Sequence, residues 1–205
     1  SIETTARIKK TDNAFLQWRN IPFSERRILM NDAAGVLRKN IDEYSRLMTM
    51  EMGKVIKESR AEIEKCAWVC EYYADNAERF LEDEIIETDA GKSFVSFAPL
   101  GAILAVMPWH FPFWQVFRFA APALMAGNTA VLKHASNVPG CALAIEDVFR
   151  QAGFPKDVFT TLLISSAKVE AVIRDKRIKA VTLTGSEPAG AQAAAAAGSE
   201  IKKTV

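Results

Sequence analysis

The pattern of apolar and polar positions divides the chain into two parts. Through the first eighty residues, apolar side chains recur every three or four positions, which is the period of an amphipathic helix. The longest such segment runs over residues 54–81, with an apolar stripe on one side and Glu, Lys and Arg on the other. Asn40 followed by Glu43 resembles a capping box and predicts the start of a further helix there.

The pattern changes after Glu84. Short apolar segments flank a polar turn at residues 89–92, where Asp and Gly supply the backbone freedom that a tight turn needs, so residues 85–98 are predicted to form a β-hairpin. Two strands alone are marginally stable in water. The hairpin is therefore expected either to pack against its own domain or to reach another subunit.

From Gly101 onward, short apolar strands alternate with helices. The predicted strands are residues 102–107, 129–133, 159–164 and 180–184, with a fifth beginning at 201–205. The predicted helices are residues 113–126, 139–152, 167–175 and 188–197. This alternation predicts an α/β fold with a parallel sheet covered by helices on both faces. Ligands of such sheets bind at the carboxyl ends of the strands.

Composition narrows the class of protein. The chain has 205 residues, of which 49% are hydrophobic and 25% charged, as in a globular protein rather than a disordered one. Lys and Arg number 26 against 25 Asp and Glu, so neither a nucleic acid nor an anionic membrane is an expected partner. The longest apolar stretch, residues 99–126, is interrupted by Pro108, His110 and Arg118, which excludes a bilayer-spanning helix.

Cysteine usage and the first residues predict a cytoplasmic location. Three cysteines are an odd number, so we expect no disulfide framework and a reducing compartment. Residues 1–20 contain no apolar core, so no secretory signal is expected. Cys66 and Cys70 lie one helical turn apart and could touch one metal ion. No His or third Cys lies nearby, so packing in the core is favoured and no metal site is predicted.

Several polar residues follow the predicted strands directly. Lys133 either points a cation into the crevice at the strand ends or lies along the surface. Ser136 either caps the next helix or meets a ligand oxygen. Thr184-Gly185-Ser186 joins a strand to a helix. Its glycine permits close approach of a ligand and the helix N-terminus favours an anion, although such a turn can also be a simple connection.

Two histidines and one arginine add to this candidate chemistry. His110 and His134 both lie at predicted strand ends, and no third ligand makes either part of a metal site. Arg118 lies among apolar residues of the predicted helix 113–126 and is therefore expected to be buried. A buried guanidinium needs an anionic partner, which is either an internal carboxylate or the carboxylate of a ligand.

Five segments, taken together, resemble the aldehyde dehydrogenase superfamily in order and spacing across nearly the whole chain. They are Pro108-Trp109-His110-Phe111-Pro112, residues 121–129, Val131-Leu132-Lys133, Ala152-Gly153-Phe154-Pro155 and Thr184-Gly185-Ser186. The helix 113–126 further resembles the succinate-semialdehyde branch. The resemblance implies a helical segment over residues 1–84 that packs on the cofactor domain, an oligomerisation hairpin over 85–98, and an incomplete Rossmann-like NAD(P)-binding domain over 99–205.

The resemblance also implies a reaction, the oxidation of an aldehyde to a carboxylic acid. A cysteine thiolate attacks the carbonyl, hydride passes to the nicotinamide, and a glutamate-activated water cleaves the thioester. In the family, the strand near residues 202–205 leads into the general base, with the nucleophile beyond. The chain stops before both, so the catalytic domain is expected to be absent and the chain alone inactive. The alternative is a non-catalytic nucleotide-binding or oligomerisation module.

The resemblance assigns roles to residues of this sequence. His110 stands where the family usually has an asparagine that stabilises the substrate oxyanion, and a histidine N–H can also donate to that oxygen. Arg118 aligns with the arginine that holds the substrate carboxylate in succinate-semialdehyde dehydrogenases, which implies succinic semialdehyde or a similar substrate. The residues implied in cofactor binding are Met107, Pro108, Trp109, Lys133, Ser136, Thr184, Gly185 and Ser186.

Ser136 leads to a prediction about the cofactor. Many family members have a glutamate there that binds both ribose hydroxyls and favours NAD. A serine leaves room for a 2′-phosphate, and Lys133, helped by a protonated His134, supplies positive charge, so NADP is expected and NAD is the alternative. The expected partners are a small aldehyde and, in the full-length enzyme, further copies of the chain in a dimer or tetramer.

Overall fold

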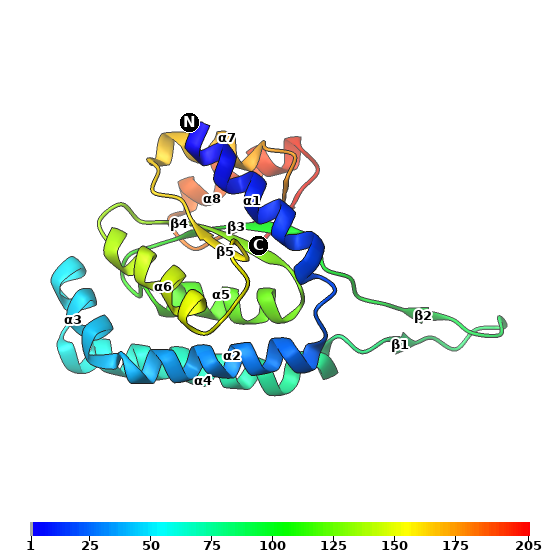
Figure 1. The fold of residues 1–205 in the computed structure, drawn as a ribbon. Helices are drawn as coiled ribbons and strands as arrows, with labels where there is room; N and C mark the ends of the chain where they lie inside the picture. The colour runs from blue at the N-terminus through cyan, green and yellow to red at the C-terminus, as the bar shows by residue number, and fades with distance from the viewer. Residues whose placement is uncertain (1) are drawn as a thin grey trace.

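The computed structural model describes residues 2–205 (Figure 1). Its helices are α1 (Ile2–Trp18), α2 (Phe23–Lys39), α3 (Ile41–Met52), α4 (Ile56–Phe80), α5 (Trp114–Met125), α6 (Pro139–Gln151), α7 (Val169–Ile173), preceded by a 3-10 turn η1 (Ser166–Lys168), and α8 (Glu187–Ser199). Its strands are β1 (Glu84–Ile85), β2 (Phe94–Val95), β3 (Ala102–Met107), β4 (Thr129–His134), β5 (Phe159–Thr161), β6 (Ile178–Leu183) and β7 (Lys203–Thr204).

The sheet has five strands in the order β5-β4-β3-β6-β7, and every neighbouring pair is parallel. Every residue of β4 is buried, as expected for a strand covered on both faces. The predicted α/β fold with a parallel sheet is thus confirmed. Predicted strand 159–164 is shorter than expected, since β5 pairs with β4 only over Phe159–Thr161.

Helices cover the sheet unequally. On one face α5 and α6 lie between the sheet and an outer layer of the long helices α2 and α4, and on the other face lie α1, α7 and α8 (Figure 1). The α5–α4 side is the larger core. Its aromatic centre is Phe149, whose ring lies 5.3 Å from that of Phe117 and 4.7 Å from that of Phe159.

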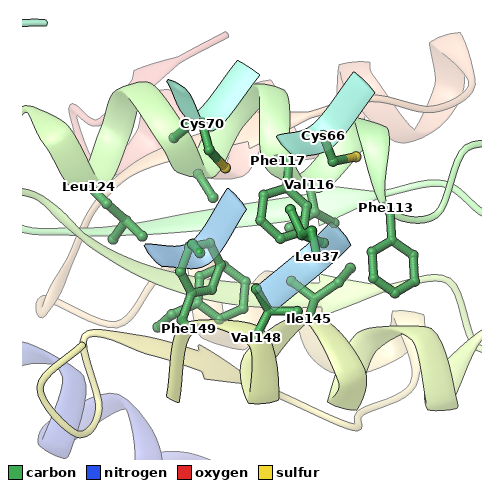
Figure 2. Close-up of a cluster of buried hydrophobic side chains, with 14 of the residues drawn as sticks. Leu37, Cys66, Cys70, Phe113, Val116, Phe117, Leu124, Ile145, Val148 and Phe149 are labelled. Carbon is green, nitrogen blue, oxygen red and sulfur yellow. The ribbon is translucent and has the colours of Figure 1, made fainter. Parts of the chain in front are cut away.

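The two cysteines of α4 belong to this core. Figure 2 shows Cys66 and Cys70 among the apolar side chains that α2, α5 and α6 bring together. Both thiols are fully buried, and desolvation raises the pKa of each. Within residues 2–205 no group of His, Cys, Asp and Glu could hold a metal ion. Core packing, the favoured interpretation of these cysteines, is confirmed.

The hairpin extends away from the body of the molecule (Figure 1). β1 pairs with β2 in antiparallel register, with Glu84 opposite Val95 and Ile85 opposite Phe94. Its apolar side chains stay exposed, as Ile85 is 66% accessible and Phe94 46%. The expectation that the hairpin packs against its own domain is therefore wrong for the described chain.

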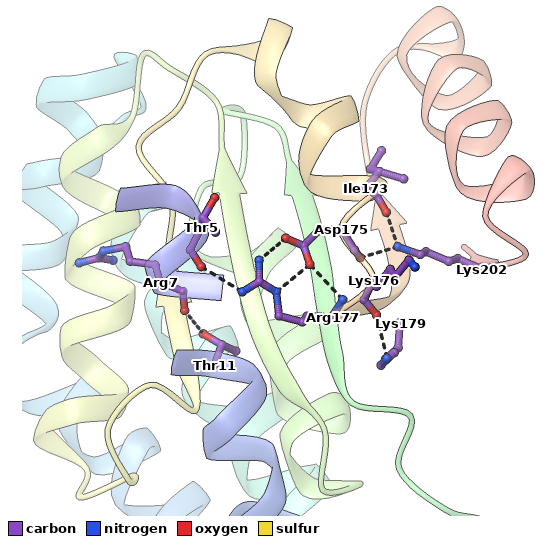
Figure 3. Close-up of polar contacts among 9 residues, drawn as sticks. All are labelled: Thr5, Arg7, Thr11, Ile173, Asp175, Lys176, Arg177, Lys179 and Lys202. Carbon is purple, nitrogen blue, oxygen red and sulfur yellow. Dashed lines mark hydrogen bonds and ion pairs between the residues drawn. The ribbon is translucent and has the colours of Figure 1, made fainter. Parts of the chain in front are cut away.

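At the amino ends of the strands, a group of polar contacts joins α1 to the loop before β6 (Figure 3). The Arg177 guanidinium donates to both carboxylate oxygens of Asp175 and to the carbonyl of Thr5. Lys202 donates to the carbonyls of Ile173 and Asp175, which fixes the start of β7. This arrangement lies at the end of the sheet opposite to the candidate site.

The predicted capping box is wrong. The Asn40 side chain makes no cap to α3 and instead donates to the carbonyl of Val36 at the end of α2. Since α2 ends where α3 begins, the Asn40 amide has partners on either side, and it also lies 3.4 Å from the Tyr44 hydroxyl of α3. No helix of residues 2–205 has the length and apolar composition that crossing a membrane requires.

Candidate functional site

The carboxyl ends of three central strands meet at one edge of the sheet. Val106 of β3 lies in register between Lys133 of β4 and Leu183 of β6. The amide of Thr184, just past β6, donates to the carbonyl of Val106 at 3.0 Å. The residues predicted from the strand ends are thereby brought to one edge, as parallel strands require.

One cavity opens on the α7–α8 side of this edge and encloses about 560 Å³. We call it the Lys133 cavity; its lining includes Val106, Lys133, Ser166, Leu183 and Gln192. Lys133 is only 8% exposed, and burial lowers the pKa of its ammonium. No residue of the described chain forms an ion pair with it. A buried ammonium that faces a cavity without an acidic partner favours an anionic ligand.

A second cation lies in the Lys133 cavity but is already neutralised. The Arg174 guanidinium pairs with Glu170 at 2.9 Å and with Glu200 at 3.2 Å. Lys133 is therefore the better candidate for holding a phosphate or ribose.

A groove of about 400 Å³ lies on the opposite, α5 side of the sheet. We call it the Arg118 groove; its lining includes Met107, Arg118, Phe119, Thr184 and Val205. The expectation that Arg118 is buried is wrong, because α5 buries its neighbours Phe117 and Ala120 against α4 and leaves Arg118 on the exposed side.

Among the residues that the structure describes, the Arg118 guanidinium has one polar contact, from its Nη2 to the Thr184 hydroxyl at 3.3 Å. Within residues 2–205 no carboxylate pairs with it. Of the two partners expected from the sequence, the internal carboxylate is thus not found in the described chain. The guanidinium is free to receive a ligand carboxylate in the groove.

The loop between β3 and α5 carries the candidate oxyanion donor. Pro108 is half-buried, whereas Trp109 and His110 are exposed. The His110 ring lies between two aromatic rings in edge-on geometry, 6.1 Å from Trp109 and 5.3 Å from Phe111. Trp109 is 49% exposed and Phe111 44%, so these two rings leave the imidazole open on the surface, whereas Phe113 lies in the core.

His134 is a structural residue. It is 5% exposed, its Nδ1 accepts from the amide of Ala135 at 2.9 Å, and its Nε2 lies 2.9 Å from the carbonyl of Pro112. Nδ1 also lies 3.3 Å from the carbonyl of Met107, and the shorter contact from the Ala135 amide favours the neutral tautomer with hydrogen on Nε2. Desolvation lowers the pKa of His134, so the expectation that a protonated His134 adds charge to the cofactor site is wrong.

His134 predicts a pH dependence of stability. Its pKa is lower in the folded chain than in the unfolded chain, so the unfolded state binds more protons, and stability is lost as the pH falls through the unfolded value of about 6.5. Between about pH 7.5 and about pH 5.5, the free energy of unfolding is therefore expected to fall on this account. In His134→Gln, which keeps a donor for Pro112, this dependence should be smaller. Urea-unfolding midpoints that change equally with pH in both proteins would contradict the assignment.

Ser136 is exposed on the loop between β4 and α6, and its hydroxyl does not cap α6. Glu51 does so instead, with one carboxylate oxygen on the amide of Gly140 at 2.7 Å and the other on that of Cys141 at 2.8 Å. The capping alternative for Ser136 is therefore wrong. A contact with a ligand remains its other interpretation.

Sequence reasoning missed two buried charged residues beside the site, Glu62 and Lys54. Glu62 is 4% exposed and pairs with Lys54, whose side chain is only 10% exposed. A signal was present in the sequence, because Glu62 lies four residues before Cys66 and so on the apolar stripe of α4. A carboxylate on such a stripe needs a partner in the core.

Comparison with known proteins gives the family. The sequence profile described as "Aldehyde dehydrogenase family" matches residues 2–205. The chain belongs to the aldehyde dehydrogenase family. The resemblance found in its motifs is thereby confirmed.

Two curated relatives are similar along the whole chain. The "Probable succinate-semialdehyde dehydrogenase [NADP(+)]" of Synechocystis sp. is 55% identical over 204 residues, which cover 100% of this chain and 45% of the relative. The "Succinate-semialdehyde dehydrogenase [NADP(+)] 1" of Mycobacterium tuberculosis is 50% identical over 206 residues, which cover 99% of this chain and 45% of the relative. The chain thus spans less than half of the length of these relatives.

A solved structure agrees with the fold. Succinic semialdehyde dehydrogenase from Streptococcus pyogenes, crystallised with NADP+ as the cofactor, superposes with a TM-score of 0.95 at 39% identity. The match covers 98% of this chain and 44% of that one.

Proposed function

We propose that residues 1–205 are the cofactor-binding portion of an NADP-dependent dehydrogenase that oxidises succinic semialdehyde, or a similar aldehyde bearing a carboxylate, to the carboxylic acid. In this proposal residues 1–84 support the cofactor domain, 85–98 form an arm for a homo-oligomer, and 99–205 hold the cofactor. The enzyme would act in the cytoplasm. Relatives that are 50% and 55% identical carry the same activity in their names.

One observation carries the proposal. Two cavities lie on opposite faces of the sheet, one lined by Lys133 at the carboxyl ends of the strands, and the other running along the strands to Arg118 and Thr184 at the same ends. Each cation lacks an acidic partner within the described chain. A phosphorylated nucleotide fits the first, a small carboxylate fits the second, and the loop with His110 lies at the same edge.

In this proposal different residues of the chain bind the cofactor and the substrate. Lys133 and the turn Thr184-Gly185-Ser186 bind the cofactor, with Met107, Pro108 and Trp109 at the end of β3. The bound nicotinamide would accept the hydride of the aldehyde. Arg118 would hold the substrate carboxylate, and His110 would donate a hydrogen bond to the oxygen that becomes negative during attack.

The chain supplies no nucleophile of its own in this proposal. Its three cysteines are all buried, and burial raises the pKa of each thiol, including that of Cys141. A thiol that stays protonated in a core cannot attack an aldehyde. The nucleophilic cysteine and the general base are therefore expected outside residues 1–205, and the chain by itself is expected to be inactive.

Ser136→Glu tests the cofactor assignment. A glutamate there would repel the 2′-phosphate of NADP, so the affinity for NADP should fall about tenfold while the affinity for NAD holds or improves. The measurement is a titration of the full-length enzyme with each cofactor. Ser136→Gln, of equal size but neutral, is the matched control and should lose less affinity. Tighter binding of NAD by the wild type, with no loss for NADP in Ser136→Glu, would defeat the assignment.

The alternative function is a non-catalytic nucleotide-binding or oligomerisation module. The exposed apolar hairpin is the observation that favours it. The intact mass of the protein separates the two. A mass near 22.6 kDa supports a separate module, whereas roughly twice that mass or more, together with dehydrogenase activity, supports the enzyme.

A further inference from the structure

The loop that carries His110 is held at its C-terminal end by Glu62, a buried glutamate of α4. Oε1 of Glu62 accepts hydrogen bonds from the amides of Phe113 and Trp114, both at 2.9 Å, where α5 begins. No side chain of the loop itself caps α5. Glu62 lies in α4, so the start of α5 depends on a residue about fifty positions earlier in the sequence.

The other carboxylate oxygen of Glu62 pairs with Lys54. The Lys54 ammonium also lies 3.8 Å from the centre of the Phe111 ring, which adjoins His110. One ion pair therefore contacts the loop in two ways, through the backbone at the start of α5 and through an aromatic face in its middle. The pair is nearly closed to water, so both interactions are stronger than they would be at the surface.

We propose that Glu62, with Lys54 as its counter-ion, is a positioning residue for the reaction, because it fixes the loop that carries His110 and the first turn of the helix that carries Arg118. This rests on the proposed function. A negative charge at a helix N-terminus stabilises the first turn, and Arg118 lies one turn beyond Trp114. Small displacements of groups that contact a substrate reduce the rate strongly.

The geometry of the Lys133 cavity should not depend on the Lys54–Glu62 ion pair. Lys133 and Leu183 face α7 and α8 on the other side of the sheet, whereas Glu62 belongs to the α4–α5 side. Of the proposed cofactor contacts only Pro108 and Trp109 belong to the loop, so loss of Glu62 should lower kcat by a larger factor than it weakens NADP binding. A general loosening of the fold would weaken both.

The test uses the full-length enzyme and three variants. Glu62→Ala should lower kcat about tenfold or more, with succinic semialdehyde and with a neutral aldehyde alike, and raise the Kd for NADP by a clearly smaller factor, because Lys133 and the turn Thr184-Gly185-Ser186 stay in place. Glu62→Gln keeps an oxygen for the two amides and should recover part of the loss. Lys54→Met/Glu62→Gln leaves no unpaired buried charge, so it stays informative if Glu62→Ala does not fold.

Glu51→Gln is the matched control, because Glu51 caps α6 with the same chemistry and lies outside the loop of His110. It should leave kcat unchanged. Amide hydrogen exchange of residues 108–118 gives a readout that is independent of activity, and it should speed up in the Glu62 variants only.

Equal losses of kcat in the Glu51 and Glu62 variants, or a loss of NADP affinity in Glu62→Ala as large as its loss of kcat, would overturn the proposal. The proposal would also be overturned if the amide hydrogens of residues 108–118 exchanged at the same rate in Glu62→Ala as in the wild type. A wild type that oxidises only the neutral aldehyde would instead overturn the substrate assignment, since the comparison of kcat between variants can still be made with that aldehyde.

Discussion

Replacing His110 by alanine in the full-length enzyme is expected to lower kcat about a hundredfold or more. Loss of one donor to an oxyanion costs roughly 3–4 kcal/mol in the barrier, because the donor is already aimed at the atom where negative charge develops. The imidazole is exposed between Trp109 and Phe111, so its removal leaves no cavity in the core. The loss should appear in kcat, and KM should change little.

His110→Asn is the informative companion variant. An asparagine amide also presents an N–H donor and is the residue that the family usually has there. Retention of most of the activity by His110→Asn, with a large loss in His110→Ala, would support the donor role. If His110→Ala kept the wild-type kcat, the imidazole would only pack against its aromatic neighbours.

Replacing Arg118 by alanine is expected to raise KM for succinic semialdehyde at least tenfold more than KM for a neutral aldehyde of similar length. A hydrogen bond to a charged group contributes about 1.5–3 kcal/mol, and a bidentate guanidinium–carboxylate pair provides two. The guanidinium contacts only the Thr184 hydroxyl in the described chain, so its anion-binding capacity is not used by the fold. Steady-state kinetics with both aldehydes measure the difference.

Arg118→Lys is the matched control for charge. A lysine keeps the positive charge but loses the planar pair of donors, so it should recover only part of the selectivity. Equal increases of KM for both aldehydes in Arg118→Ala would mean that the arginine does not bind the substrate carboxylate.

The fold could be predicted from the sequence because its signals are local. Each buried parallel strand is a short apolar run, and each helix repeats apolar residues at the helical period. β4 is the clearest case, since all six residues from Thr129 to His134 are buried and the apolar run of residues 130–132 ends at Lys133, which marks the site. The strand ends followed from topology alone.

The roles of individual polar residues were harder to predict because they depend on packing between distant elements. Arg118 lies in an apolar helix but on its exposed side, which the sequence of the helix alone does not reveal. Ser136 and Asn40 have the right residue types for helix caps. Their helices are nevertheless capped or joined differently, α6 by Glu51 from α3 and α3 by its direct continuity with α2.

The partners of Glu62 were also not predictable from the sequence alone. Its position on an apolar stripe indicates a buried partner but not which one. The partners prove to be the nearby Lys54 and the start of α5, and only the folded chain brings the start of α5 to Glu62.

The most direct test of the central proposal is the reaction itself. The full-length enzyme would be incubated with succinic semialdehyde and either NADP or NAD, and both the reduced cofactor and the acid product would be quantified. The proposal predicts one NADPH and one succinate for each aldehyde consumed, with a higher kcat/KM for NADP than for NAD. Failure to reduce either cofactor, or turnover of neutral aldehydes alone, would contradict it.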